Sequence, residues 1–277
     1  MTSFALSPSR RDELAALLGD EVRLQVEYPK VAEYLDTAAA LPVGDPDEAR
    51  LLDLRMLHFL TGGASSNPYW DVLEPLVSAG VEGRSVGSPG EGRARLVYAQ
   101  TVLQETYAYA VPSPETLEWI GSSVGTRGLC EIGAGRGYWA GLLAERGIDV
   151  RAFDSEPPDF VANPSFPEAV GRRAVWHPVE GLPDLESAWP ENDLGDRVLF
   201  LCWPPGWGDP MSVTSLRDYA EAGGDHLIYI GEPRGGKTAT DEFFDELADA
   251  WTLDAQDESF VSWWNLDDVA QSWRRRR

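Results

Sequence analysis

The sequence predicts an α/β fold in which a parallel, doubly wound sheet follows an N-terminal helical region. Three observations support this prediction. The first part of the chain carries apolar residues at helical spacings of three and four. The second part alternates short apolar strands with helices, and a glycine-rich turn joins its first strand to the next helix. We therefore expect two regions, 1–111 and 112–277.

The helices of the first region are predicted from apolar spacing and from residues that begin or end a helix. Asp45 is a candidate N-cap, because Pro46 follows at the first helical position and Glu48 stands three residues after the cap. Five glycines within residues 80–92 predict a loop. The predicted helices cover residues 13–18, 22–28, 31–41, 49–60, 69–76 and 94–109.

The second region opens with a helix after the proline-rich break at residues 111–114. Helices are predicted over residues 114–123, 138–146 and 238–249. Strands are predicted over residues 128–132, 150–153, 174–176, 198–203, 226–230, 251–255 and 259–264. Because strands that alternate with helices form crossover units, this sheet is expected to be parallel. The arginines at 274–277 are expected to form a solvated tail.

Composition and charge exclude several classes of protein. Against 23 Lys and Arg the chain of 277 residues has 46 Asp and Glu, a formal net charge of −23, which repels phosphate backbones and anionic lipids. We therefore expect a small-molecule substrate, with no nucleic-acid and no membrane partner. Two cysteines and three separated histidines give no metal-ligand spacing, so no metal site is expected. No signal peptide or membrane span is visible, and a cytoplasmic protein is expected.

The most informative segment is the glycine loop after the first strand of the second region. Glu131 lies near the end of that strand, and Gly133, Gly135 and Gly137 alternate before the next helix. Glycines at such a turn permit positive φ angles and let the backbone approach a ligand. The dinucleotide fingerprint G-x-G-x-x-G would need a glycine where the chain has Tyr138. The spacing is instead E-x-G-x-G-x-G.

This spacing resembles motif I of the class I S-adenosylmethionine-dependent methyltransferases. The resemblance covers about residues 112–265 and implies a Rossmann-like sheet and S-adenosyl-L-methionine as the cofactor. The N-terminal helices are expected to form a cap over the carboxyl edge of the sheet, where doubly wound folds bind ligands. Asp154 ends the next strand, 23 residues after Glu131, where the family has an acid that binds the ribose hydroxyls. Glu180 and Gly181 lie where the family places adenine contacts. The expected cofactor-binding residues are Glu131, Gly133, Gly135, Gly137, Asp154, Glu180, Gly181, Cys202 and Trp203.

The fourth strand ends in a tryptophan and two prolines. The run Cys202-Trp203-Pro204-Pro205-Gly206-Trp207 is similar to the [D/N]-P-P-[Y/F/W] motif IV of amino-directed methyltransferases. Here Trp203 stands where the family has its acid or amide, so the usual hydrogen-bond acceptor is missing and base methylation is not expected. Trp203 and Trp207 are predicted to face the methionine part of the cofactor or an apolar substrate.

A second motif competes with this interpretation. Residues 231–238 match the phosphate-loop pattern G-x-x-x-x-G-K-[ST], which would make Lys237 the phosphate-binding residue of a nucleotide phosphotransferase. Glu232 inside the loop would repel a phosphate, and no later strand ends in a magnesium-binding Asp. We therefore expect Glu232 to end the fifth strand and face the site.

The candidate catalytic residues are Glu232, Tyr109 and His58, and the candidate substrate-binding residues are Tyr107, Trp207 and Trp70. Methyl transfer profits chiefly from alignment, and a general base contributes where the nucleophile must lose a proton. Glu232 is the first candidate for that base. His58 lies in an apolar helical stretch, and the two tyrosines lie in the segment that leads to the glycine loop.

The expected function is methyl transfer from S-adenosylmethionine to a small, partly apolar molecule, as in secondary metabolism. Three alternatives stay open from the sequence. A lyase or cyclase would act on the aminobutyrate arm of S-adenosylmethionine and release methylthioadenosine. A phosphotransferase would use Lys237, and a regulatory protein would bind the cofactor without turnover.

Overall fold

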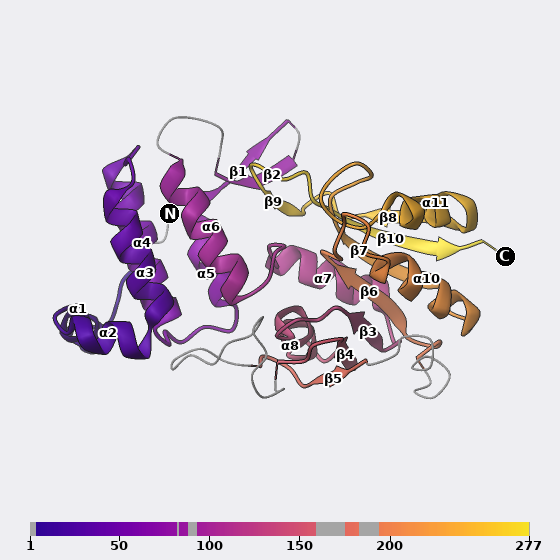
Figure 1. Ribbon diagram of the computed structural model, residues 1–277, viewed down its shortest axis with the longest axis horizontal. Helices are drawn as coiled ribbons and strands as arrows, with labels where there is room; N and C mark the ends of the chain where they lie inside the picture. The colour runs from indigo at the N-terminus through magenta and orange to yellow at the C-terminus, as the bar shows by residue number, and fades with distance from the viewer. Residues whose placement is uncertain (1–3, 82, 88–92, 159–174, 183–193, 277) are drawn as a thin grey trace. The chain divides into compact units, whose positions relative to one another are not determined.

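The computed structural model describes residues 4–81, 83–87, 93–158, 175–182 and 194–276 (Figure 1). These residues group into two units by their internal contacts. The described residues of the first unit are 4–75 and 93–106, and those of the second are 76–81, 83–87, 107–158, 175–182 and 194–276. A boundary at residue 112 and a cap over the sheet stay predictions.

The first unit is helical. Its helices are α1 (Pro8–Leu18), α2 (Glu21–Glu27), α3 (Pro29–Ala40), α4 (Pro46–Leu60), α5 (Pro68–Leu73) and α6 (Ala94–Thr106). α4 begins as the sequence predicts, because the Asp45 carboxylate accepts the backbone N–H groups of Asp47 (2.8 Å) and Glu48 (3.2 Å). Between the helices, the buried Tyr34 hydroxyl donates to Asp53 (2.8 Å), which also pairs with Arg95. These contacts hold α3, α4 and α6 together.

The second unit is built on a sheet that has seven strands among the described residues. The strands are β3 (Leu129–Ile132), β4 (Val150–Asp154), β5 (Val179–Gly181), β6 (Val198–Cys202), β7 (His226–Gly231), β8 (Trp251–Gln256) and β10 (Val269–Arg275). Their order is β5-β4-β3-β6-β7-β10-β8. The first five are parallel to one another, and β10 is antiparallel to both β7 and β8. This is a doubly wound, Rossmann-like sheet, so the predicted α/β fold class is confirmed, but the sheet is mixed and not wholly parallel because β10 runs antiparallel beside β7.

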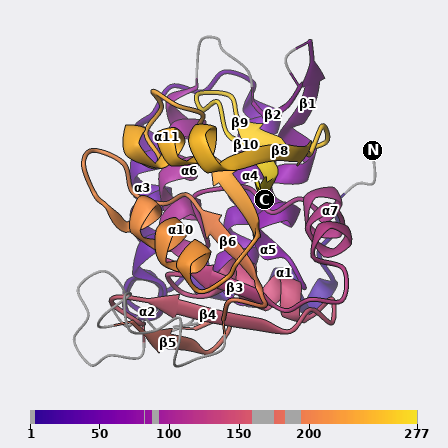
Figure 2. The ribbon, with the colours of Figure 1, turned by 90° about the vertical axis from the view of Figure 1, so that its right-hand side faces the viewer.

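Helices cover both faces of this sheet. α7 (Pro114–Val124) packs with α8 (Tyr138–Ala144), α10 (Met211–Glu221) packs with α11 (Asp241–Ala250), and the two pairs lie on opposite faces (Figures 1 and 2). Leu199 and Leu201 belong to a buried cluster with Val213 of α10 and Phe243 of α11. Phe200 points the other way, with its ring 5.8 Å from that of Trp139 in α8. β6 is apolar throughout because both of its faces are covered.

A smaller sheet takes one strand, β2 (Gly83–Val86), from the predicted loop at residues 80–92 and another, β9 (Val261–Trp263), from the predicted strand at residues 259–264. β1 (Val77–Gly80) and β2 form a hairpin, and β2 pairs in parallel with β9. The loop prediction was wrong because the short strands β1 and β2 are largely exposed and glycine-flanked, so they lack an apolar alternation. Residues 88–92 of the predicted loop lie outside the described residues.

Other boundaries also differ from prediction; α1 begins at Pro8 instead of residue 13, and α5 ends at Leu73 instead of residue 76. Ala174 lies outside the described residues, and Val175–Trp176 is not in a strand; the third strand, β5, begins at Val179. α6 ends at Thr106, and α11 begins at Asp241. The largest correction is β10, which includes Arg274 and Arg275 of the predicted solvated tail. This strand is polar in sequence because only alternate residues such as Ala270 and Ser272 are buried.

Candidate functional site

The turn between β3 and α8 is shaped by three glycines in left-handed conformations. The φ angles are +78° at Gly133, +56° at Gly135 and +71° at Gly137. Such angles are strained for residues with a Cβ. A Cβ on Gly137 would also lie only 2.9 Å from the carbonyl oxygen of His177. The alternating glycines of the motif are therefore required by the backbone of this loop.

Asp154 connects the glycine loop to the end of β4. Its Oδ2 accepts the backbone N–H of Gly135 (2.8 Å), and its Oδ1 accepts that of Glu156 (2.9 Å). A carboxylate has about four acceptor positions, so each oxygen can accept a further hydrogen bond. The structure thus brings two of the predicted cofactor residues into contact and leaves acceptor capacity on the carboxylate.

A cavity of about 500 Å³ opens beside this loop. It lies at the carboxyl ends of β3, β4 and β6, where the strand order changes direction and doubly wound sheets bind their ligands. Its volume lies within the range of about 300–1,000 Å³ that is typical of small-molecule sites. The lining residues are Ile132, Gly133, Asp154, Ser155, Leu182, Trp203, Pro205, Asp209, Pro210, Met211 and Thr214.

The start of α10 supplies a wall of the cavity that the sequence interpretation missed. Asp209 Oδ1 accepts the backbone N–H of Met211 (2.9 Å). The Met211 methyl group lies so close to Gly133 that a Cβ there would collide with it. The signal was present, because Asp-Pro before an amphipathic segment is typical of a helix start.

Glu131 is a buried acid behind the glycine loop, with only 2% of its surface exposed. Burial raises the pKa of Glu131 to about 8; a hydrogen bond from the backbone of Ala140 in α8 opposes the rise, and the charge of Asp154 adds to it. Its Oε2 has no hydrogen-bond partner within the described part of the chain. Glu131 is therefore mostly protonated at neutral pH.

The end of β6 brings together two aromatic residues from distant segments. Trp203 has a φ of +56°, and its backbone N–H donates to Ile230 of β7 (2.7 Å). The ring of Tyr109 stacks on the indole, with centroids 4.9 Å apart and planes at 11°. Tyr109 is 54% exposed. The sequence predicts both residues for the site, and the structure places them in contact.

Asp268 is a site residue that the sequence interpretation missed. Trp203 Nε1 donates to Asp268 Oδ1 (2.9 Å). Asp268 directly precedes β10, whose first residue, Val269, pairs with Gly231 at the end of β7. Burial raises the pKa of Asp268 to about 7, with the Trp203 hydrogen bond opposing the rise and Glu232 adding to it. The residue was missed because nothing in the sequence marked β10.

Glu232 holds two loops together. One of its carboxylate oxygens accepts the backbone N–H of Lys237, and the other accepts that of Asp267 (3.4 Å). The side chain is 5% exposed. These contacts join the loop before α11 to the segment before β10, and the role of Glu232 as a base stays a prediction.

The same carboxylate contradicts the phosphate-loop alternative. It turns inward against the glycines, since a Cβ on Gly236 would lie 2.9 Å from Glu232 Oε2. The Thr238 hydroxyl binds the Glu232 backbone and the Tyr229 hydroxyl (2.8 Å each). α11 begins only at Asp241, so the loop does not run directly into a helix. An acid therefore lies where phosphate oxygens would need backbone donors.

Three other predicted cofactor residues, Glu180, Gly181 and Cys202, lie in strands of the large sheet. Glu180 lies within β5 and pairs with Arg151 of β4, with 2.8 Å from one guanidinium nitrogen to each carboxylate oxygen. Gly181 ends β5, and the next residue, Leu182, is the one that lines the cavity. Cys202 ends β6, and burial raises the pKa of its thiol.

Two predicted substrate residues of the second unit, Tyr107 and Trp207, are not among the residues that line the cavity. Tyr107 is buried against Tyr138 (ring centroids 5.0 Å apart), and Trp207 is 88% exposed. In the first unit, His58 Nδ1 accepts the Arg10 Nε–H (3.1 Å), and burial and the Arg10 charge lower the pKa of His58. Trp70 is 7% exposed in α5 of that unit. The roles of these four residues in catalysis and substrate binding stay predictions.

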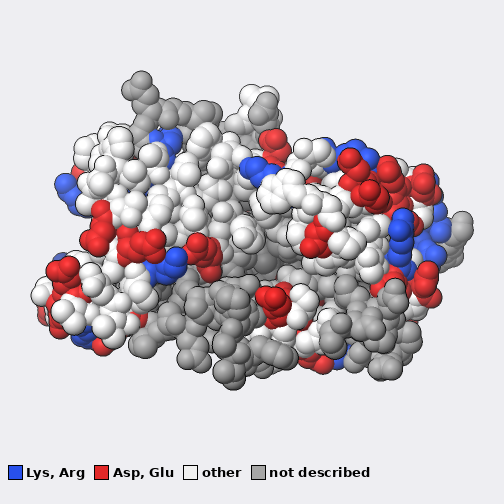
Figure 3. All heavy atoms as spheres, viewed as in Figure 1, with Lys and Arg blue, Asp and Glu red and all other residues white. Residues whose placement is uncertain are grey.

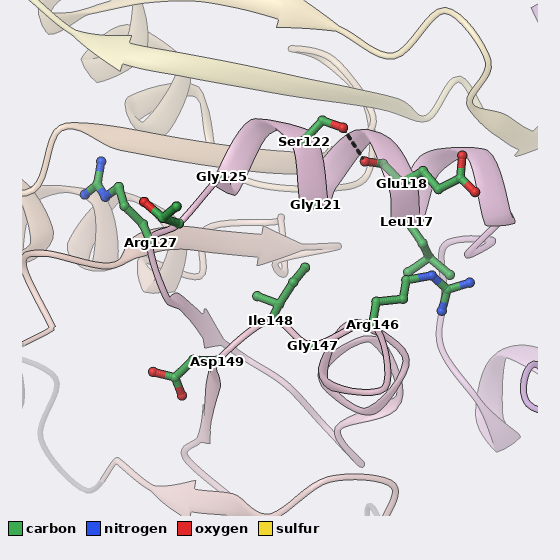
Figure 4. Close-up of a pocket in the computed structure, with 11 residues that line it drawn as sticks. Leu117, Glu118, Gly121, Ser122, Gly125, Arg127, Arg146, Gly147, Ile148 and Asp149 are labelled. Atoms are coloured by element: carbon green, nitrogen blue, oxygen red, sulfur yellow. Dashed lines mark hydrogen bonds between the residues drawn. The ribbon is translucent and has the colours of Figure 1, made fainter.

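A second cavity, of about 710 Å³, lies at the amino edge of the sheet (Figure 4). The end of α7 and the turns that lead into β3 and β4 line it, with Arg127, Arg146 and Asp149 among its side chains. Arg127 pairs with Asp225 (2.7 Å). None of the residues predicted for the site lines this cavity, so the carboxyl-edge cavity is the candidate functional site.

Acidic side chains gather over α11 in the view of Figure 3, where Asp241, Glu242, Asp245 and Asp249 are exposed.

Among the described residues, no helix combines the length and apolar character needed to cross a membrane.

Comparisons with known proteins were made for the sequence and for the structure. No protein-family model and no curated protein matches the sequence. Among solved structures, magnesium protoporphyrin IX methyltransferase from Synechocystis PCC 6803 with bound SAH is similar at 14% identity and a TM-score of 0.39, over 68% of this chain and 90% of that one. The S-adenosylmethionine-dependent methyltransferase SibL is similar at 14% identity and a TM-score of 0.39, over 96% and 76%.

A third similar structure is the CcbJ methyltransferase from Streptomyces caelestis, at 14% identity and a TM-score of 0.37, over 60% of this chain and 97% of that one. Similarities of this degree do not bear on substrate or reaction. The strand order of the chain itself defines its fold.

Proposed function

We propose that the chain is an S-adenosylmethionine-dependent methyltransferase that acts on a small, partly apolar molecule. The observation that carries the proposal is the juxtaposition, at the carboxyl edge of the sheet, of the left-handed glycine loop, the Asp154 carboxylate and a cavity of about 500 Å³. When bound, the cofactor would supply an electrophilic methyl group on a sulfonium.

The residues around the cavity fit this cofactor. Asp154 keeps acceptor positions for a ribose diol, and the missing Cβ at Gly133 lets the Met211 methyl group pack against the loop backbone at the cavity wall. Leu182 and Ile132 offer apolar surface suited to a base. Two carboxylates and no Lys or Arg occur among the described lining residues, which favours a ligand with positive charge.

The chain's contribution to the reaction would be alignment. Orientation of two reactants can supply on the order of 7–11 kcal/mol of a barrier, and rigid loop walls such as Pro205 and Pro210 suit that task. A small acceptor fits the net charge of −23 better than a nucleic acid does. The apolar share of the lining residues supports a partly apolar acceptor.

The test is to incubate the purified protein with S-adenosylmethionine and pools of small-molecule acceptors, and to identify the released nucleoside by mass spectrometry. Acceptor-dependent S-adenosylhomocysteine supports methyl transfer. Methylthioadenosine would instead assign chemistry on the aminobutyrate arm and overturn the proposal. Asp154→Ala, with its carboxylate removed, is expected to lose the product.

A further inference from the structure

Trp203 is held more firmly than a residue that only fills space would need. Its backbone donates to Ile230 (2.7 Å), its indole N–H donates to Asp268 (2.9 Å), and Tyr109 stacks on its ring. The positive φ of Trp203 is a conformation that costs energy for a non-glycine residue. Three contacts therefore hold a strained residue that lines the cavity.

The hydrogen bond to Asp268 also changes the electrostatics of the ring. Asp268 is 7% exposed, and its Oδ2 has no hydrogen-bond partner among the residues that the structure describes. An indole that donates to a carboxylate is richer in electrons than a free one, and indole faces attract cations. The carboxylates of Asp154 and Asp209 on the cavity wall also favour a bound cation.

We propose that Trp203, positioned by Asp268, recognises the sulfonium charge of S-adenosylmethionine. Asp268 would then supply from the start of β10 the carboxylate that is missing from the Trp-Pro-Pro sequence after β6, but it would act through the ring instead of directly on a nucleophile. Asp268 is a positioning residue in this scheme. This inference rests on the proposed function and adds to it the residue that distinguishes the cation from its neutral product.

The test compares two ligands of nearly the same shape. Isothermal titration calorimetry measures the affinity of S-adenosylmethionine, a cation at sulfur, and of S-adenosylhomocysteine, the neutral thioether. Trp203→Leu is expected to lower the ratio of the two affinities by about 2- to 30-fold, the range of a cation–π contact. The loss is expected in S-adenosylmethionine binding, with S-adenosylhomocysteine binding nearly unchanged.

Asp268→Asn keeps the shape of the side chain and an acceptor for the indole N–H, so it serves where the leucine variant does not fold. At pH 8.5, above the raised pKa of Asp268, it is expected to lower the same ratio by about twofold or more, because a charged acceptor is lost. Asp267→Asn is the matched control, since it removes the same charge from the adjacent exposed residue. The control is expected to leave the ratio unchanged.

Two results would overturn the inference. Equal losses for both ligands in Trp203→Leu or Asp268→Asn would show that the pair only supports the cavity wall. An equal change of the ratio in Asp267→Asn would assign the effect to net charge instead of the ring. Failure of the wild-type protein to bind either ligand would refute the proposed function itself, together with this inference.

Discussion

The pH dependence of stability is expected to reveal Glu131 as a buried, protonated acid. The perturbation is Glu131→Gln, which replaces the carboxyl with a neutral group of the same shape. Burial raises the pKa of Glu131 in the folded chain to about 8, against an ordinary value of 4.5. Between these two values the folded state holds a proton that the unfolded state has released.

The sign of the effect follows from this proton. A state that binds more protons is favoured by acid, so the wild-type free energy of unfolding contains a contribution that is present below pH 4.5 and is lost as the pH rises toward about 8. The loss is about 1.4 kcal/mol per pH unit. From pH 5 to pH 7 the stability of the wild type should therefore fall relative to Glu131→Gln by about 2.5 kcal/mol.

The assay is urea unfolding of both proteins at pH 5, 6 and 7. Their difference cancels the other titrating groups, which include His226, whose pKa is lowered to about 4 by burial and by nearby arginines. Glu118→Gln, which removes an exposed carboxylate of α7, is the matched control. If the difference between wild type and Glu131→Gln does not vary with pH, or varies equally in the control, the burial argument is refuted.

Three other perturbations test separate parts of the structure. Gly137→Ala places a Cβ 2.9 Å from the His177 carbonyl oxygen in a left-handed residue with a φ of +71°. Because of this contact, the free energy of unfolding should fall by more than the about 1–2 kcal/mol of left-handed backbone strain alone; a loss within that range in urea unfolding would contradict the close contact. ATP should not bind the wild-type protein in calorimetry, and ATP binding that Lys237→Ala abolishes would restore the phosphate-loop alternative. Because burial raises the thiol pKa of both Cys130 and Cys202, iodoacetamide should alkylate them slowly in the folded protein and rapidly in urea; rapid labelling of the folded protein would show that the thiols are accessible.

The parts of the fold that the sequence could predict are those with strong local signals. β6 and β7 are continuous apolar runs because both faces of the central sheet are covered, and the glycine loop is defined by three left-handed residues. β10 could not be recognised, because its antiparallel pairing with β7 buries only alternate residues and leaves arginines in the strand. That failure concealed Asp268, whose place beside Trp203 depends entirely on tertiary pairing.

Some residues of the candidate site could likewise be predicted from the sequence, and others could not. Gly135 and Asp154 could be assigned from spacing, since the loop and the end of the next strand meet wherever parallel strands are neighbours. The wall formed by Asp209 and Met211 depends on how α10 starts after the β6 loop. Glu232 was expected to face the site, and sequence alone does not show that two backbone N–H groups bind its carboxylate.

The central claim is that the carboxyl-edge cavity binds S-adenosylmethionine through Asp154. Calorimetric titration of S-adenosylmethionine into the wild-type protein and into Asp154→Asn tests it most directly. We expect saturable binding by the wild type and an affinity that is lower by about 10- to 100-fold in the variant, the effect of hydrogen bonds to a charged acceptor. Absence of binding in the wild type, or equal affinity in both proteins, would contradict it.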